Sequence, residues 1–207
     1  MPDTNPKARP AATRETEIAD DRRRQLVSTA ASLFEDGYHS TSLNDLARAV
    51  GISKPTIYHY FGSKEEILFW IHEEFIDVLI SREQERAALE LTPSNHLLAI
   101  MEDILELMAS HRGHVRTFFE HYRELSAPRR RKIKAKRDEY EAAVRGVIAR
   151  GIEDGSFRAV DTHLATLALA GMCNWGYQWY SPGGTKSTHD IAQEFFSIFM
   201  HGIAESG

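Results

Sequence analysis

The sequence predicts an all-α protein with about nine helices. Apolar residues recur at three- and four-residue intervals along most of the chain, and no segment shows the strict alternation of a half-buried strand. Ser, Thr and Asp residues stand where these periodic segments begin, which is typical of helix N-caps. The chain has 207 residues, of which 42% are hydrophobic, so it can bury a sizeable core in one large domain or two small ones.

The N-terminal third contains a short arm followed by four predicted helices. Residues 1–19 hold three prolines and almost no bulky apolar residue, which favours a flexible arm. Residues 20–37 predict the first helix. Ser42 and Ser53 then cap two short helices, and Ser63 starts a long helix that runs to about residue 85.

The remaining two thirds also have a helical pattern. We expect a helix from Thr92 to a break at His111, and three further helices over about 114–125, 128–153 and 161–180. A last amphipathic helix is predicted from about Thr188 to residue 204.

Charge and cysteine content narrow the classes of protein. The formal net charge is −5, so any contact with nucleic acid has to come from a small patch rather than a global field. The lone cysteine, Cys173, leaves no intramolecular disulfide. Because the sequence has neither a signal-peptide pattern nor a long apolar run, we expect a cytoplasmic protein with no membrane partner.

Two short helices joined by Gly51-Ile52-Ser53 have the size of a helix-turn-helix. The second of them is expected to turn Ile57 and Phe61 inward. Its outer face then carries hydrogen-bond donors that can meet phosphates and base edges in a major groove: Lys54, Thr56, Tyr58 and His59.

The segment Thr41-Ser-Leu-Asn-Asp-Leu-Ala47, followed by Gly51-Ile-Ser-Lys-Pro-Thr-Ile-Tyr-His-Tyr-Phe-Gly-Ser-Lys-Glu-Glu-Ile67, resembles the DNA-binding domain of the TetR family of repressors. The resemblance spans about residues 22–70. It implies a flexible arm over 1–19, a helix-turn-helix domain over 20–66, and a helical ligand-sensing and dimerisation domain over 67–207.

The resemblance also implies an operator of palindromic or pseudo-palindromic DNA, read by a homodimer. It assigns base or near-base contacts to Asn44, Lys54, Pro55, Thr56 and His59. It assigns phosphate contacts to Ser42, Tyr58 and Lys64.

The second domain is expected to bind a small, mostly apolar effector. The helix over 161–180 has an apolar stripe that favours either a pocket wall or a core or subunit contact. We hypothesise a pocket lined by residues of this helix and the preceding ones: Met101, Met108, Phe118, Phe119, Tyr122, Met172, Trp175 and Gln178.

The ending Trp179-Tyr-Ser-Pro-Gly-Gly184 resembles TetR-type regulators of lipid and steroid catabolism, a branch whose members often sense acyl-coenzyme A thioesters. The chain has Gln178 where that branch often has an arginine. The last helix predicts a dimer contact, because its apolar stripe would be exposed on a monomer. The expected interface residues are Trp179, Ile191, Phe195, Ile198 and Phe199.

Two other classes of protein are the alternatives, an enzyme and an apolar carrier that binds no operator. The sequence has no Glu-x-x-His, His-Glu-x-x-His or Gly-x-Ser-x-Gly motif, so we expect no catalytic residues. His111 and His114 have a spacing found in metal sites but no Cys or carboxylate beside them. We therefore expect no metal and no cofactor.

Overall fold

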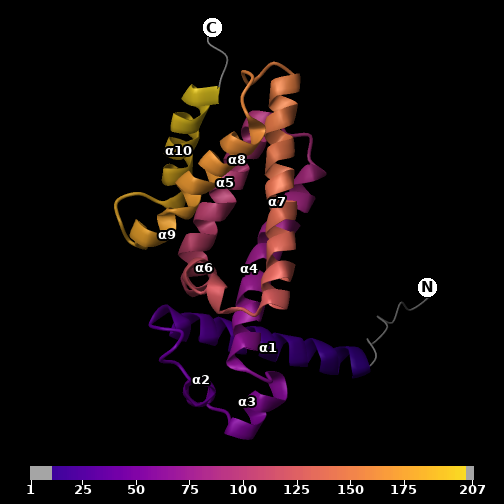
Figure 1. Ribbon diagram of the computed structural model, residues 1–207, viewed down its shortest axis with the longest axis vertical. Coiled ribbons are helices and arrows are strands. Elements are labelled where there is room, and N and C mark those ends of the chain that lie inside the picture. The colour runs from indigo at the N-terminus through magenta and orange to yellow at the C-terminus, as the bar shows by residue number, and fades with distance from the viewer. Residues whose placement is uncertain (1–10, 204–207) are drawn as a thin grey trace, which may run out of the picture.

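The computed structural model describes residues 11–203 and confirms the all-helical fold (Figure 1). The residues 1–10 and 204–207 lie outside this description, and with them half of the expected arm. The helices are α1 (Ala11–Glu35), α2 (Leu43–Ala49), α3 (Lys54–Tyr60), α4 (Lys64–Ala87), α5 (Pro93–Ser110), α6 (Arg112–Glu120), the 3-10 turn η1 (Tyr122–Glu124), α7 (Ala127–Glu153), α8 (Thr162–Asn174), α9 (Gly176–Trp179) and α10 (Thr188–Ile203).

Helices α1, α2 and α3 form one end of the molecule, and serine caps fix where the two short helices begin. The Ser42 hydroxyl accepts a hydrogen bond from the Asp45 amide, and the Asp45 carboxylate accepts one from the Ser42 amide in return. Ser53 caps α3 through the Thr56 amide at 3.3 Å. Gly51, at φ +69°, makes the turn between α2 and α3, a conformation that favours glycine.

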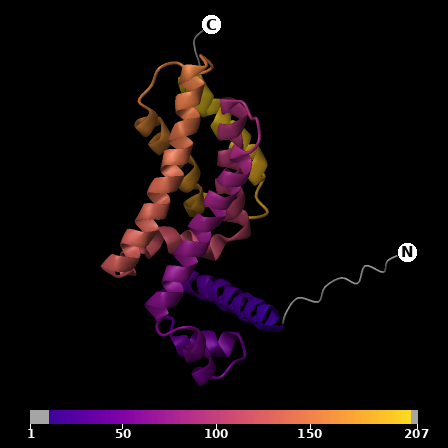
Figure 2. The same cartoon turned by 90° about the vertical axis from the view of Figure 1, so that its right-hand side faces the viewer.

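Helix α4 leaves this end and runs into the bundle of α5 to α10 (Figure 2). Its N-cap is Ser63, which accepts from the Glu66 amide at 3.1 Å. Helix α4 packs against α7 and α6, while α5 lies between α4, α7 and α10. Buried apolar residues from Leu26 in α1 to Phe199 in α10 form one continuous core, so the two ends of the molecule share their packing.

Three helix boundaries differ from the sequence prediction. Helix α1 begins at Ala11, because residues 11–19 contain no Gly or Pro and extending an existing helix costs little. The expected arm therefore is helical from Ala11 onward. The helix expected over 161–180 is divided at Trp175 into α8 and α9. Helix α6 starts at Arg112, so the expected break is shorter than the sequence suggested.

A close contact between α6 and α1 joins the two ends of the molecule. A Cβ atom placed on Gly113 of α6 would lie 2.7 Å from the carbonyl oxygen of Ala31 in α1. Only glycine lets these two backbones approach so closely. Arg112 also pairs with Glu35 of α1 at 2.8 Å.

Candidate DNA-binding surface and ligand cavity

Helix α3 presents a polar outer face on an apolar base. Ile57 and Phe61 are fully buried, as the sequence predicted, because they pack against the core formed with α1 and α4. The residues proposed to meet DNA are exposed on the outer face: Lys54, Pro55, Thr56, Tyr58 and His59. Lys54 and Tyr58 lie side by side, with the ammonium 6.0 Å from the ring centroid. The geometry is that of a helix able to enter a major groove.

The two α2 residues proposed to meet DNA are also at this surface. Asn44 and Ser42 are exposed, but the Ser42 hydroxyl already bonds to Asp45 at 2.6 Å. This contact lowers the pKa of the Asp45 carboxyl below its ordinary value. Ser42 therefore acts first as the cap of α2, and a phosphate contact would need its hydroxyl proton to leave the Asp45 carboxylate.

Lys64 is bonded inside the protein, where the sequence suggested a phosphate contact. Its ammonium donates hydrogen bonds to the carbonyls of Tyr38 at 2.7 Å and Thr41 at 3.0 Å, and lies 4.1 Å from the Tyr38 ring centroid. Desolvation at this position lowers the pKa of Lys64. Lys64 therefore connects the loop after α1 to the start of α4. Two of the three hydrogen-bond donors of its ammonium are taken up by carbonyls of the protein itself.

A cavity of about 290 Å³ lies in the sensor bundle and is bordered by five helices. Its inner wall is apolar and comes from α4, α5 and α6. Helices α7 and α8 supply the outer wall. The residues that line it are Phe75, Ile76, Leu79, Ile104, Phe118, Phe119, Arg137, Tyr140, Glu141, Val144, Thr166, Leu167, Leu169, Ala170, Gly171 and Asn174.

Polar groups occur at a few points of this wall. Arg137 is exposed, and its guanidinium lies 5.4 Å from the ring centroid of Phe118. Among residues 20–201 no carboxylate lies within ion-pair distance of Arg137, and the nearby Glu141 of the same wall pairs with His163 at 3.0 Å. Burial raises the pKa of the Tyr140 hydroxyl well above its ordinary value, and the Asp103 and Glu83 carboxylates add to this. Tyr140 therefore stays neutral and can act as a hydrogen-bond donor.

Two of the residues hypothesised to line a pocket, Phe118 and Phe119, border this cavity. Met101 and Met108 are buried in the core beside it. Tyr122 donates its hydroxyl to the Arg130 carbonyl at 3.0 Å. None of these three borders the cavity, and neither does the half-buried Met172.

The hypothesis that Trp175 and Gln178 form a pocket wall is wrong for this cavity. Trp175 is 63% exposed, and Gln178 is exposed as well. They lie on the outside because the inner face of α8 is instead made by Thr166, Leu169 and Cys173, which are buried. Sequence reasoning missed Arg137 and the α4 residues, since nothing local separates a cavity wall from ordinary core.

The outer face of α8 to α10 is apolar and exposed. Most of the large hydrophobic side chains that are exposed in the described part of the chain are on it: Leu164, Leu167, Trp175, Trp179 and Ile198. Of the residues expected at the dimer interface, Trp179 and Ile198 belong to this face, and the half-buried Phe195 touches the Trp179 ring at 6.2 Å.

Ile191 and Phe199, also expected at the interface, are only 6% and 7% exposed. They are buried within the subunit because α10 packs along α5. Their side chains are therefore not part of an exposed stripe on the single subunit, and their role in a dimer contact stays a prediction. His111 and His114 lie with ring centroids 5.7 Å apart, and residues 11–203 contain no group of three or more side chains suited to a metal. No helix in that range is long and apolar enough to cross a membrane.

The fold and the exposed helix-turn-helix define a class of bacterial DNA-binding regulator. Residues 26–70 match the family of bacterial regulatory proteins, tetR family, and residues 90–203 match the tetracyclin repressor-like C-terminal domain. The chain belongs to the TetR family of transcriptional regulators, and the relatives it matches are regulators rather than enzymes.

One related repressor and two solved structures show which TetR regulators the chain resembles. It is 31% identical to the HTH-type transcriptional repressor KstR2 of Rhodococcus jostii over 186 residues, which is 88% of this chain and 91% of the relative. The TetR regulator PfmR of Thermus thermophilus has 33% identity and a TM-score of 0.80, over 85% of this chain and 97% of that one. AibR, solved in complex with isovaleryl coenzyme A and operator DNA, has 27% identity and a TM-score of 0.76, over 86% and 97%.

Proposed function

We propose that this protein is a ligand-responsive repressor. It binds operator DNA as a homodimer and is released when a small, mostly apolar ligand fills the cavity between α4 and α8. The observation that carries this proposal is the continuity of α4. The helix starts at Lys64, shortly after α3 ends at Tyr60, and bears Phe75, Ile76 and Leu79 of the cavity wall. A movement of the cavity wall on α4 is therefore transmitted along this helix to α3, the DNA-reading helix.

The exposed face of α3 supports the DNA side of the proposal. The side chains of Lys54, Tyr58 and His59 are exposed there, so they can reach phosphates and base edges. A dimer has to hold two such helices about 34–36 Å apart to reach successive major grooves. A tilt of α4 that moves α3 by a few ångströms would change this spacing and prevent both helices from entering their grooves.

The cavity supports an acyl-coenzyme A thioester as the ligand. An acyl chain matches the apolar wall, and the exposed guanidinium of Arg137 offers a charge-assisted bond to a phosphate or carboxylate at the outer edge. Gln178 stands where regulators of the lipid and steroid branch often have an arginine. Arg137 on α7 supplies a cation to the cavity in its place. The likeness to AibR, whose complex contains isovaleryl coenzyme A and operator DNA, supports the same ligand class.

The apolar face of α8 to α10 supports the homodimer. Several large apolar side chains exposed on adjoining helices are typical of a protein contact. Trp175→Glu would place a charge among these apolar side chains, so the variant should sediment as a monomer. Leu89→Glu is the matched control, because Leu89 is 60% exposed but belongs to the loop between α4 and α5 and not to α8, α9 or α10.

The test of the proposed function combines an operator selection with calorimetry. An operator is selected from random DNA, and the dissociation constant of isovaleryl coenzyme A is then measured for free and operator-bound protein, with a longer acyl thioester in parallel. If ligand weakens operator binding, operator must weaken ligand binding by the same factor. We expect a factor of at least about ten, within the usual range of such coupling.

Arg137→Met separates the ligand site from the DNA site. It should weaken thioester binding while leaving operator affinity unchanged. Equal ligand affinities with and without operator would contradict release by ligand. A chain that binds the thioester but selects no DNA would favour the alternative function, an apolar carrier.

A further inference from the structure

Two hollows in this molecule share one residue. The first is the cavity between α4 and α8. The second is a groove of about 480 Å³ on the other side of α4, bordered by α1, α4, the end of α5 and the start of α6. Phe75 is the one described residue that lines both.

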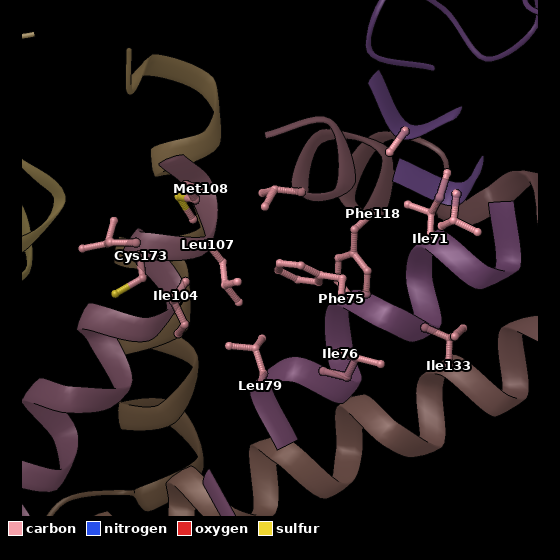
Figure 3. Packing of buried hydrophobic residues seen from close by; sticks show 14 of the residues in the cluster. Ile71, Phe75, Ile76, Leu79, Ile104, Leu107, Met108, Phe118, Ile133 and Cys173 are labelled. Carbon is pink, nitrogen blue, oxygen red and sulfur yellow. The ribbon is translucent and has the colours of Figure 1, made fainter. Parts of the chain in front are cut away.

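The Phe75 ring is held on the sensor side by a second ring. Its centroid lies 4.7 Å from that of Phe118 in α6, and the two rings lie side by side between α4 and α6 (Figure 3). The Phe75 side chain is only 5% exposed. A ligand that needs more room than the cavity offers has to push on the residues of its wall, and Phe75 is the wall residue with open space behind it.

The groove behind the ring touches the DNA-binding end of the molecule. Arg24 and Ser28 of α1 form one side of it, and His114 of α6 forms another. Beside this groove α6 and α1 meet at Gly113 and Ala31 without room for a Cβ atom. A ring that enters the groove therefore presses on the contact between α1 and α6.

We propose that Phe75 is the switch residue that carries ligand binding to the DNA-binding end. With the cavity empty, the ring closes the cavity wall and leaves the groove open. A ligand displaces the ring toward the groove, and the ring then moves α1 relative to α4. This inference rests on the proposed function, since it needs a ligand in the cavity and DNA at α3.

Phe118 is less suited to this role, although it also lines the cavity. It borders only that hollow, and Phe119 and His72 surround its ring at 5.3 and 5.2 Å. A ring enclosed in this way transmits a push to its neighbours but has no free space to enter. Of the described residues, Phe75 alone lines both the cavity and the groove.

A variant that fills the cavity without any ligand tests the proposal. Ala170 of α8 lines the cavity, so Ala170→Trp should occupy it. Gly171→Leu is a second filling variant, because a Cβ at Gly171 meets nothing within 4 Å. We expect Ala170→Trp to weaken binding to a selected operator about tenfold, by anisotropy, as coupling between sites commonly does.

The same filling variant is then made with Phe75→Leu, which keeps an apolar side chain but shortens its reach. The operator loss should fall to about twofold or less, since a leucine does not span from cavity to groove. Phe69→Leu is the matched control. Phe69 is also a buried phenylalanine of α4 but borders neither hollow, so the tenfold loss should persist.

A distance measurement gives an independent readout. Spin labels at Tyr58→Cys on α3 and Lys134→Cys on α7 report the tilt of one end against the other, while the native Cys173 is fully buried. Ala170→Trp should change this distance in the parent and in Phe69→Leu, but not in Phe75→Leu. The proposal is overturned if filling the cavity acts equally with and without the Phe75 ring, or changes neither operator affinity nor distance. A parent protein that selects no operator would instead overturn the proposed function.

Discussion

The DNA-reading surface and the ligand cavity differ in how many helices build them. One seven-residue helix, α3, carries nearly all of the polar outer face at the DNA-binding end. The cavity takes its wall from five helices, and neighbouring wall residues such as Leu79 and Thr166 are far apart in sequence. The first site is therefore a local property of the chain, while the second exists only after the bundle has packed.

The two regions also treat polar side chains differently. Around α3, hydroxyl and carboxylate groups cap helices at the surface, as Ser53 and Asp45 do. In the sensor bundle, polar groups are buried and constrain their surroundings, as His72 and Tyr140 show. This difference predicts that pH and volume changes act strongly on the sensor side, whereas changes near α3 act mainly on DNA binding and local stability.

The largest expected effect comes from His72, a fully buried histidine of α4. Its Nδ1 lies 2.8 Å from the Leu68 carbonyl oxygen, and its Nε2 makes no hydrogen bond within the described part of the chain. Burial lowers the pKa of His72 to about 4. The unfolded chain takes up this proton near pH 6.5, so stability is complete above that pH and is lost as pH falls toward 4. The loss by pH 4 is about 3 kcal/mol.

The variant His72→Phe should remove this part of the pH dependence. We expect its free energy of unfolding in urea to fall less steeply than that of the parent between about pH 7 and pH 4. His59→Phe on α3 is the control, because His59 is exposed and should leave the slope as it is. Parallel curves for the parent and His72→Phe would contradict the assignment of the slope to His72.

The second effect lies at the joint between the two regions. Gly113→Ala would bring a Cβ within 2.7 Å of the Ala31 carbonyl oxygen, and backbone cannot yield as a flexible side chain does. Overpacking of this kind costs about 3 kcal/mol, and the better helix propensity of alanine returns up to about 1 kcal/mol. We expect a net loss near 2 kcal/mol, seen as a lower urea midpoint.

Gly146→Ala is the matched control for that variant. Gly146 lies within α7, and a Cβ there meets nothing within 4 Å. The same substitution should therefore stabilise the protein by about 0.5–1 kcal/mol. If both variants shift stability in the same direction, the contact of α6 with α1 is not as tight as described.

The difference between a surface carried by one helix and a cavity built by five helices explains which features the sequence could predict. The start of α3, its inward Ile57 and its exposed polar residues follow from caps and periodicity within a few residues, and the structure has them where they were expected. The apolar stripe of the helix over 161–180 was equally clear as a pattern. Which of its faces turns inward depends on α4, α5 and α7, so the pattern could not decide between a pocket wall and a subunit contact for Trp175, which is exposed and does not border the cavity.

Lys64 and Arg137 show the same limit for charged residues. A lysine after a helix-turn-helix is indistinguishable in sequence from one that bonds to carbonyls 23 and 26 residues earlier. Arg137 lies in a basic stretch of α7 that is typical of a solvated helix face. Its position at the cavity is set by the packing of α7 against α4 and α8, which no local pattern records.

The smallest effect concerns Lys64 itself and separates structure from DNA contact within one region. Lys64→Met keeps the apolar stem but removes the ammonium that bonds to Tyr38 and Thr41. A hydrogen bond to a charged group contributes about 1.5 kcal/mol at the low end, so we expect a loss of that order in the free energy of unfolding. Lys54→Met, at an exposed position of α3, should leave stability unchanged and instead weaken operator binding, with a salt dependence reduced by about one ion. Urea unfolding and anisotropy titrations at several salt concentrations measure the two properties separately. If Lys64→Met keeps full stability and loses operator affinity with the same change in salt slope, Lys64 serves as a phosphate contact and its bonds to the α1 loop give way when DNA binds.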